Sequence, residues 1–217
     1  QTRGAKVVNI DPRRTATSEG ADLHLSLAPG SDTHLWNGLL AWLADTDALG
    51  LDYIAAHTDG FVETLAAARN DAGSIANVAF KTGLAEHDVR NFFKMWAATP
   101  RVVSCYSQGI NQSIDGTDKV NAIINWHLAT GRIAKPGAGP LSRTGQPNAM
   151  GGREVGGLAN MLAAHMGFLE PERDLVRRFW KAPNLVSGEG LKAVQMFDAI
   201  DRGEIKALWV MGSNPAV

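Results

Sequence analysis

The glycine-dense loop at residues 145–157 holds the residue type that best suits binding of a small anion, Arg153. Glycine has no Cβ, so the backbone of such a loop can adopt positive φ angles and come close to a large ligand. The guanidinium of Arg153 is a planar fork of donors that matches a small planar oxyanion. Gln146 and Glu154 stand in the same loop. A loop of this composition is more often a solvated surface segment, but other polar segments favour a binding role here.

Polar residues follow a strand predicted at residues 7–10. A carboxylate after a strand can accept hydrogen bonds from a ribose hydroxyl, and arginines beside it can contact phosphate. The alternative is that these residues only form a charged, solvent-exposed loop after the strand. No Gly-x-Gly-x-x-Gly motif precedes the strand within the chain. The residues in this segment are Asp11, Arg13, Arg14 and Thr15.

Two further segments carry polar groups that could meet the same ligand. Gly30, Ser31 and Asp32 stand at the predicted start of a helix, where free amide groups can bind anions or polar rings. A plain N-cap is the alternative there. Side-chain amides follow a strand predicted at residues 101–106, and they suit a heteroaromatic ligand with many donors and acceptors. These amides belong to Gln108, Asn111 and Gln112.

Strand-like and helical segments alternate along the chain. A β-branched run predicts a strand at residues 7–10, and an alternating pattern predicts an extended stretch at 21–27. Apolar runs predict a buried strand at 101–106 and a last strand at 207–211. Helical spacing of apolar residues predicts helices over 35–43, 51–56, 60–69, 86–98, 116–129 and 172–180, and further helices from 158 and from 191. This order predicts an α/β fold, with a Rossmann-like parallel sheet covered by helices on both faces and part of a second α/β domain. We expect a cofactor-binding domain over 1–135 and the substrate loop in 136–217.

Composition narrows the class of protein. Hydrophobic residues make up 45% of the 217 residues and charged residues 20%, as in soluble globular proteins. A formal net charge of −1 gives no general attraction for nucleic acid or for an anionic membrane, and no apolar run is long enough to span one. The single cysteine, Cys105, is expected to be a small core residue within a strand. One cysteine cannot ligate an iron–sulfur cluster within the chain. Six scattered histidines argue against a metal site.

The two ends of the sequence predict that the chain is an excerpt from a longer protein. The first residue is Gln1, and a predicted strand begins within six residues of it. The last predicted strand, residues 207–211, is followed by only a few residues. A strand needs hydrogen-bonded neighbours, so we expect its partners elsewhere in the protein.

The ordered motifs resemble those of the molybdopterin oxidoreductases over essentially the whole chain. Residues 10–15, 21–25 and 29–32 look like the dinucleotide-binding portion of these enzymes, and 57–61 is similar to a recurrent helix start. The match continues through 109–112, 125–131 and 135–137, and Gly212-Ser213-Asn214-Pro215 resembles the family's Gly-x-Asn-Pro turn. The loop at 145–157 looks most like that of nitrate reductases of the cytoplasmic assimilatory branch.

This resemblance implies a bis(molybdopterin guanine dinucleotide) cofactor that holds one molybdenum, and a 4Fe-4S cluster ligated outside this chain. It also assigns roles to individual positions. One dinucleotide arm would contact Asp11, Arg13, Arg14, Thr15, Gly30, Ser31 and Asp32. Gln108 and Gln112 would approach the pterin near the metal, and Asn214 would lie near a cofactor phosphate or ring. Arg153 would hold the substrate anion, with Gln146 and Glu154 shaping the loop around it.

The implied activity is reduction of nitrate to nitrite by oxygen-atom transfer, with electrons from a donor protein or a reductase subunit. The complete protein would be cytoplasmic. The excerpt alone would be inactive, and its exposed apolar surface would favour self-association. One alternative is a formate dehydrogenase or another oxyanion oxidoreductase of the same family, although formate dehydrogenases usually have Gly-Gln-Asn-Asn in the loop. The other alternative is a non-enzymatic module that binds a nucleotide or cofactor.

Overall fold

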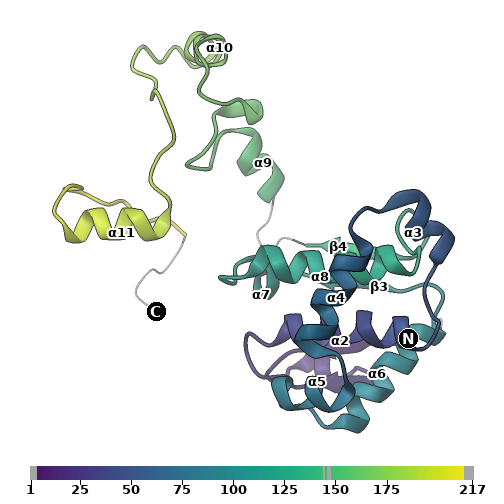
Figure 1. Ribbon diagram of the computed structural model, residues 1–217. Coiled ribbons are helices and arrows are strands. Elements are labelled where there is room, and N and C mark those ends of the chain that lie inside the picture. The colour runs from purple at the N-terminus through teal and green to yellow at the C-terminus, as the bar shows by residue number, and fades with distance from the viewer. Residues whose placement is uncertain (1–3, 144, 146–147, 213–217) are drawn as a thin grey trace. The chain divides into compact units, whose positions relative to one another are not determined.

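The computed structural model describes residues 4–143, 145 and 148–212 of the chain. It divides into two compact units, Gln1–Gly145 and Gln146–Val217 (Figure 1). None of the helices within the described ranges combines the length and hydropathy of a membrane span.

The first unit mixes short strands with helices. Its strands are β1 (Val8–Ile10), β2 (Leu23–Leu25), β3 (Val103–Tyr106) and β4 (Gly139–Ser142). Its helices are α1 (Ala16–Glu19), α2 (Asp32–Asp45), α3 (Leu51–His57), α4 (Phe61–Ala72), α5 (Ile75–Thr82), α6 (Glu86–Ala98), α7 (Gln108–Asn111) and α8 (Gly116–Ala129). The predicted helices over 51–56, 60–69, 86–98 and 116–129 are confirmed within a few residues.

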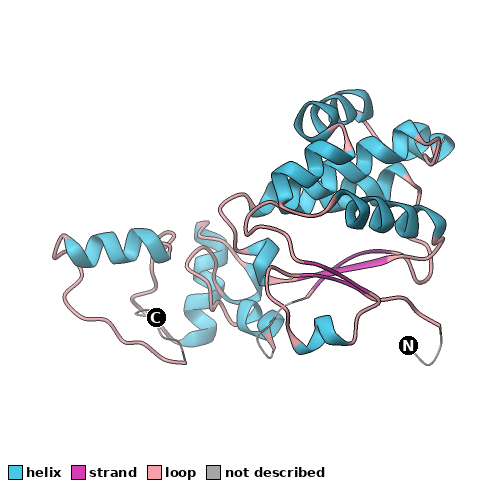
Figure 2. Cartoon of the chain, turned by 90° about the horizontal axis from the view of Figure 1, so that it is seen from below, coloured by secondary structure: helices cyan, strands magenta, loops and turns pink. Residues whose placement is uncertain are grey.

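Both sheets of the first unit are parallel pairs. Strand β1 pairs with β2, with Val8 opposite Leu23, and β3 pairs with β4, with Val103 opposite Gly139. Most helices of this unit lie on one side of the strands (Figure 2). Parallel strands joined through helices define the α/β class, so the predicted fold class is confirmed. The functional domain boundary expected at residue 135 stays a prediction.

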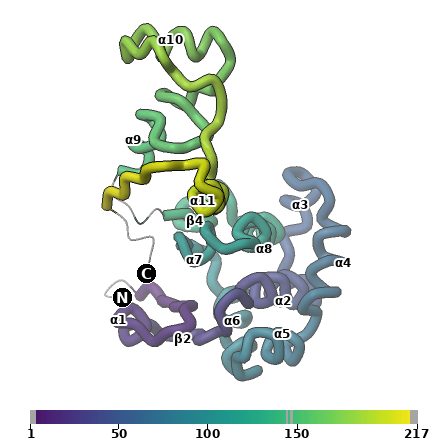
Figure 3. Tube along the Cα trace, turned by 90° about the vertical axis from the view of Figure 1, so that its left-hand side faces the viewer, coloured from purple at the N-terminus to yellow at the C-terminus, as the bar shows by residue number. Residues whose placement is uncertain are grey.

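Helix α2 is the centre of the apolar core. Its side chains Leu35, Leu39 and Leu43 are fully buried. The helix packs against α4, α5, α6 and α8, with α8 on one side and α5 on the other (Figure 3). Burying each such leucine contributes roughly 1.5–3 kcal/mol, so this stripe at i, i+4 and i+8 stabilises the packing of the helical layer. The start of α2 is therefore a rigidly held position.

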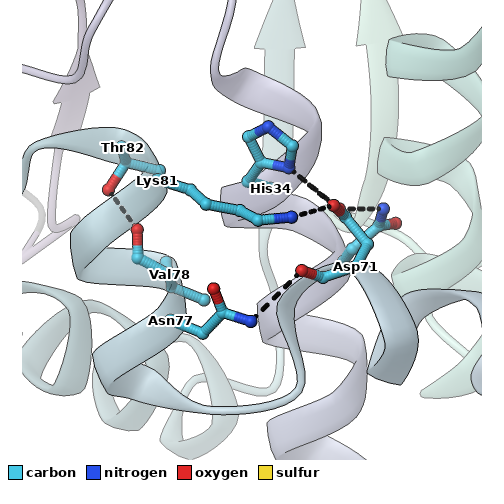
Figure 4. A network of polar contacts seen from close by, with 7 residues as sticks. His34, Asp71, Asn77, Val78, Lys81 and Thr82 are labelled. Carbon is cyan, nitrogen blue, oxygen red and sulfur yellow. Dashed lines mark hydrogen bonds and ion pairs between the residues drawn. The ribbon is translucent and has the colours of Figure 1, made fainter.

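A polar network joins α2, α4 and α5 (Figure 4). The carboxylate of Asp71 in α4 lies 2.8 Å from His34 Nδ1 and 2.8 Å from Lys81 Nζ, and it accepts a 2.8 Å bond from Asn37 Nδ2. Burial alone would raise the pKa of Asp71, but the bonds from Lys81, Asn37 and His34 outweigh burial and lower it. The network fixes the packing of three helices and lies on no loop that the sequence marks for binding.

The second unit contains α9 (Ala149–Glu154), a 3₁₀ turn (Ala163–His165), α10 (Glu170–Trp180) and α11 (Ala193–Asp201). The helices predicted at 172–180 and from 191 are confirmed. The helix predicted from residue 158 is wrong. Ala164 and His165 have φ angles of 55° and 58°, and positive φ at two residues breaks a right-handed helix.

Three other predictions about strands require correction. Residues 207–211 form no strand with any described residue, and Trp209 is 84% exposed, because an apolar run without a hydrogen-bonded neighbour does not make a sheet. The strand at 101–106 is not buried throughout, since Val103 is 48% exposed. Cys105 is exposed rather than in the core, because it lies on the same open face of the β3–β4 pair as Val103.

Candidate cofactor-binding site

The loop after β1 is held in place by its own carboxylate and by β2. Asp11 Oδ1 accepts a 2.8 Å bond from the backbone N–H of Arg13, which closes a tight turn. The carbonyl oxygen of Asp11 lies 2.9 Å from His24 Nε2, and its N–H donates to the carbonyl of Leu25. These contacts fix where the following arginines begin.

The two arginines of this loop are exposed to solvent. The side chain of Arg13 is 83% exposed, with its Nε 3.8 Å from Asp11 Oδ1, and Arg14 is also exposed. Thr15 ends the loop as the N-cap of α1, where its N–H donates to Ser18 Oγ at 3.0 Å. The two guanidiniums therefore remain available to an anion, whereas the polar groups of Thr15 serve the helix cap.

The loop after β2 lies beside the loop after β1. The hydroxyl of Ser26 donates to the carbonyl of Pro12 at 2.8 Å, so the two loops are joined at the carboxyl ends of two parallel strands. Gly30 has φ of 86°, and a Cβ built there would meet nothing within 4 Å. Ser31 is buried, and its hydroxyl donates to the carbonyl of Ala28 rather than to a ligand. Backbone at Gly30 can thus approach a ligand closely, while Ser31 shapes the turn.

Asp32 opens α2 and forms an ion pair that the sequence analysis did not identify. Its Oδ2 lies 3.1 Å from Lys119 Nζ, and the same nitrogen lies 3.3 Å from Asp115 Oδ1. The Lys119 side chain is only 2% exposed. Burial alone would lower the pKa of Lys119, but Asp32 and then Asp115 outweigh burial and raise it. The i, i+4 spacing of Asp115 and Lys119 was the available signal, but it indicates only a helical ion pair.

The amides after β3 lie on and beside the short helix α7. Gln108 begins this helix, and the N–H of Gln112, which follows it, donates to the Gln108 carbonyl at 3.0 Å. The Gln112 side chain is exposed. A hollow of about 220 Å³ adjoins the start of α8, lined by Asn111, Gly116, Thr117, Val120 and Asn121. Because Lys119 is also in α8, its pair with Asp32 connects this region to the start of α2.

Arg153 and Glu154 lie at the end of α9 in the second unit, and both are exposed. The helix begins at Asn148, whose Oδ1 accepts a bond from the N–H of Gly151 at 3.2 Å. The Arg153 guanidinium forms no ion pair or hydrogen bond with another described residue. Gln146 and Asn214 fall outside the described residues.

The first-unit residues fit the anionic, hydrogen-bonding arm that the resemblance implies. Two exposed guanidiniums can meet phosphate, and the Asp32 carboxylate can accept from a heterocycle or ribose. The space beside the Cα of Gly30 is open. Within residues 4–143, 145 and 148–212, no group of three histidine, cysteine or acidic side chains is arranged to hold a metal ion.

The fold and this loop arrangement agree with the match of residues 1–217 to the molybdopterin oxidoreductase family model. The chain belongs to this family. It is 48% identical over its full length to a nitrate reductase from Shewanella frigidimarina, of which it covers 23%. It is also 35% identical over 99% of its length to an assimilatory nitrate reductase catalytic subunit from Bacillus subtilis, of which it covers 30%. The predicted resemblance is thus confirmed, and the chain spans about a quarter of the length of these relatives.

A solved structure shows the same fold. Acetylene hydratase from Pelobacter acetylenicus superposes with a TM-score of 0.58 over 63% of this chain and 18% of that one, at 21% sequence identity. This likeness supports the arrangement of helices and parallel strands and carries no argument about substrate.

Proposed function

We propose that the complete protein, of which this chain is a part, is a molybdenum-dependent nitrate reductase that converts nitrate to nitrite. The observation that carries the proposal is the similarity to a nitrate reductase along the whole chain, including the loop that holds Arg153. The geometry of the first unit supports the cofactor side of the proposal, because the loops after β1 and β2 meet at one sheet edge. Ligands of open parallel sheets bind at that edge.

The cofactor proposed is a bis(molybdopterin guanine dinucleotide), and the first unit would hold one of its arms. Arg13 and Arg14 would contact phosphate oxygens, with Asp11 shaping the turn that presents them. Gly30 would let the ligand approach the backbone, and Asp32 would accept from the guanine or ribose. Thr15 and Ser31 would support these loops through the contacts they already make. Gln108, Gln112 and Asn214 would lie along the pterin.

The chemistry requires a cationic group that orients nitrate. Nitrate spreads one negative charge over three coplanar oxygens, and a planar guanidinium can donate to two of them at once. The Arg153 side chain is uncommitted among the described residues, so it can be recruited by a substrate. Glu154 and Gln146 would set the shape of this loop. Bound molybdenum would supply the redox chemistry. Nitrate would lose one oxygen atom, and two electrons and two protons would be taken up overall to release that oxygen as water.

Several features of the complete protein belong to the same proposal. A 4Fe-4S cluster bound outside this chain would deliver electrons from a donor protein or reductase subunit, in the cytoplasm. Residues 1–135 would form the cofactor-binding domain, and 136–217 would contribute the substrate loop. The isolated chain would be inactive and would self-associate. Large exposed apolar side chains are consistent with self-association: Trp209 is 84% exposed, Phe179 81% and Phe80 88%.

Assays of the protein encoded by the whole reading frame test this proposal. The protein, purified without oxygen and supplied with a reduced viologen dye, is expected to form nitrite from nitrate and to contain molybdenum. Formate oxidation without nitrate reduction would instead assign the protein to the formate branch. Guanine nucleotide binding without either activity would favour a binding module.

A further inference from the structure

Lys119 is the most deeply buried charged side chain that the proposed function leaves unused. Only 2% of this side chain is exposed, although lysine is rarely buried without a partner. Its nitrogen lies between two carboxylates, at 3.1 Å from Asp32 Oδ2 and 3.3 Å from Asp115 Oδ1. Burial would lower the pKa of Lys119, but Asp32 and then Asp115 raise it overall, so the ammonium group remains charged.

The pair has an uneven geometry that leaves one carboxylate oxygen available. Lys119 approaches Asp32 at Oδ2, and Oδ1 of Asp32 accepts no hydrogen bond from the rest of the described chain. The Asp32 side chain keeps 18% of its surface exposed. An ionised carboxylate has about four acceptor sites, so contact with Lys119 does not exhaust it. A ligand N–H can therefore still reach Asp32.

The charge of Lys119 also separates two like charges. Asp32 and Asp115 approach the same ammonium group, and without it the two carboxylates would repel each other at short range. Repulsion would turn the Asp32 carboxylate away from its present position, and this change would weaken an acceptor at the start of α2. Helix α2 itself is anchored by its buried leucines, so the side chain would respond rather than the helix.

We propose that Lys119 is a positioning residue for the cofactor: it holds the Asp32 carboxylate in the orientation that accepts hydrogen bonds from the guanine dinucleotide. This inference rests on the proposed function. It assigns to α8 two connected roles, because the same helix borders the hollow next to Asn111 and fixes the residue that opens α2. Lys119 itself would not contact the ligand.

The test uses the complete protein and measures cofactor content as well as activity. Lys119→Met keeps the apolar stem and removes the charge, and Asp32→Asn removes the acceptor charge. The readouts are molybdenum per protein, GMP released by acid hydrolysis, and melting temperature, all on the monodisperse folded fraction. Lys81→Met is the matched control, because Lys81 forms a 2.8 Å pair with Asp71 and neither residue is assigned a cofactor contact.

We expect Lys119→Met and Asp32→Asn each to lower GMP per protein about tenfold or more, the effect of losing a charge-assisted hydrogen bond. The double variant should lose no more than either single variant, because both changes remove the same contact. Lys81→Met should lower the melting temperature and keep the GMP content of the wild type. This combination separates a positioning role from a general loss of stability.

Three results would overturn the inference. These are wild-type GMP content in Lys119→Met, independent losses that multiply in the double variant, or an equal loss in Lys81→Met. If Lys119→Met does not fold, wild-type GMP content in the near-isosteric Asp32→Asn has the same consequence. Wild-type protein that contains GMP but does not reduce nitrate would overturn only the proposed substrate. Wild-type protein without GMP would overturn both proposals.

Discussion

The imidazole Nε2 of His127 lies 2.8 Å from the hydroxyl of Ser104, so a polar contact joins helix α8 to strand β3 inside the apolar core. His127 is fully buried and stacks on Trp126 at 4.7 Å between ring centroids. Its Nδ1 has no hydrogen-bond partner among the described residues. Burial, and then the positive charge of Arg132, lower the pKa of His127 to about 4. The ring is therefore neutral at ordinary pH.

We predict that His127 makes the stability of the first unit depend on pH. The unfolded chain binds a proton on His127 below about pH 6.5, whereas the folded chain does so only near pH 4. Stability is therefore lost as pH falls through this window, by roughly 3 kcal/mol in total. Urea unfolding of the chain at pH 7.5, 6, 5 and 4.5 measures this loss.

Variants test whether this residue is responsible. His127→Gln should be less stable than wild type at pH 7.5 and should show a flatter decline toward pH 4.5. The exposed His87, whose side chain is 75% exposed, offers a control, and His87→Gln should keep the wild-type slope. An unchanged slope in His127→Gln would mean that other groups cause the acid sensitivity.

Arg132 is predicted to stabilise the end of α6 in a way that lysine cannot replace. Its Nη2 donates to the carbonyl of Thr99 at 2.7 Å, its Nε donates to that of Pro100 at 3.3 Å, and its Cζ lies 3.8 Å from the centre of the Trp96 ring. Lysine has neither the planar fork nor the stacking surface. Arg132→Lys should therefore cost about 2 kcal/mol or more in unfolding free energy.

Urea denaturation measures this cost, and Arg90→Lys is the control. Arg90 is about half exposed and pairs with Glu86 at 3.8 Å, so its exchange should change stability by less than about 0.5 kcal/mol. Equal effects of the two exchanges would show that the buried carbonyl contacts of Arg132 contribute little.

Gly38 is predicted to be essential for the contact between α2 and α5. A Cβ at this position would lie 2.2 Å from Val78 Cγ2, and Val78 is fully buried. In an exposed helix, alanine would stabilise by about 0.5–1 kcal/mol relative to glycine. Here the steric overlap with Val78 should outweigh that gain in helix propensity, and Gly38→Ala should destabilise the unit by about 1–3 kcal/mol. Combining it with Val78→Ala should recover part of the loss, as seen in melting temperatures. A purely additive double variant would contradict the clash.

Much of the helical layer could be predicted from sequence because apolar spacing reports burial directly. Helices α6 and α8 match their predicted bounds, since each carries buried apolar residues at helical spacing. Helix α5 was not predicted, because its start and end rest on Ser74 and on Gly83 in a left-handed conformation within a short, mixed segment. Strand β4 was also not predicted, because it lies in a glycine-rich segment without a strand-like pattern and is stabilised by its pairing with β3.

The candidate site was predictable only in part, for a different reason. Loop composition indicated which residues carry suitable chemistry, and the parallel pairing of β1 and β2 explains why the loops after them meet. Sequence spacing does not reveal which side chains are already engaged. Ser31 is occupied by the Ala28 carbonyl, and Asp32 is shared with Lys119, a residue 87 positions away that no local pattern connects to it.

Arg153 gives the most direct test of the proposed substrate. In the complete protein, Arg153→Ala should lower kcat/KM for nitrate roughly tenfold to a hundredfold, because a charge-assisted contact of about 1.5–3 kcal/mol is lost from the transition state. Molybdenum and GMP content should stay at wild-type values, since Arg153 is proposed to hold substrate and not cofactor. Arg178→Ala is the control, because Arg178 lies on α10 with its side chain 70% exposed and pairs with Asp174 at 3.0 Å.

Steady-state rates with a viologen donor at several nitrate concentrations give kcat and KM separately. A rise in KM alone would assign Arg153 to recruitment of the anion, whereas a fall in kcat would assign it to orientation of the reacting oxygen. Wild-type kinetics in Arg153→Ala would remove this residue from the site, and the exposed guanidinium at the end of α9 would then be an ordinary surface group.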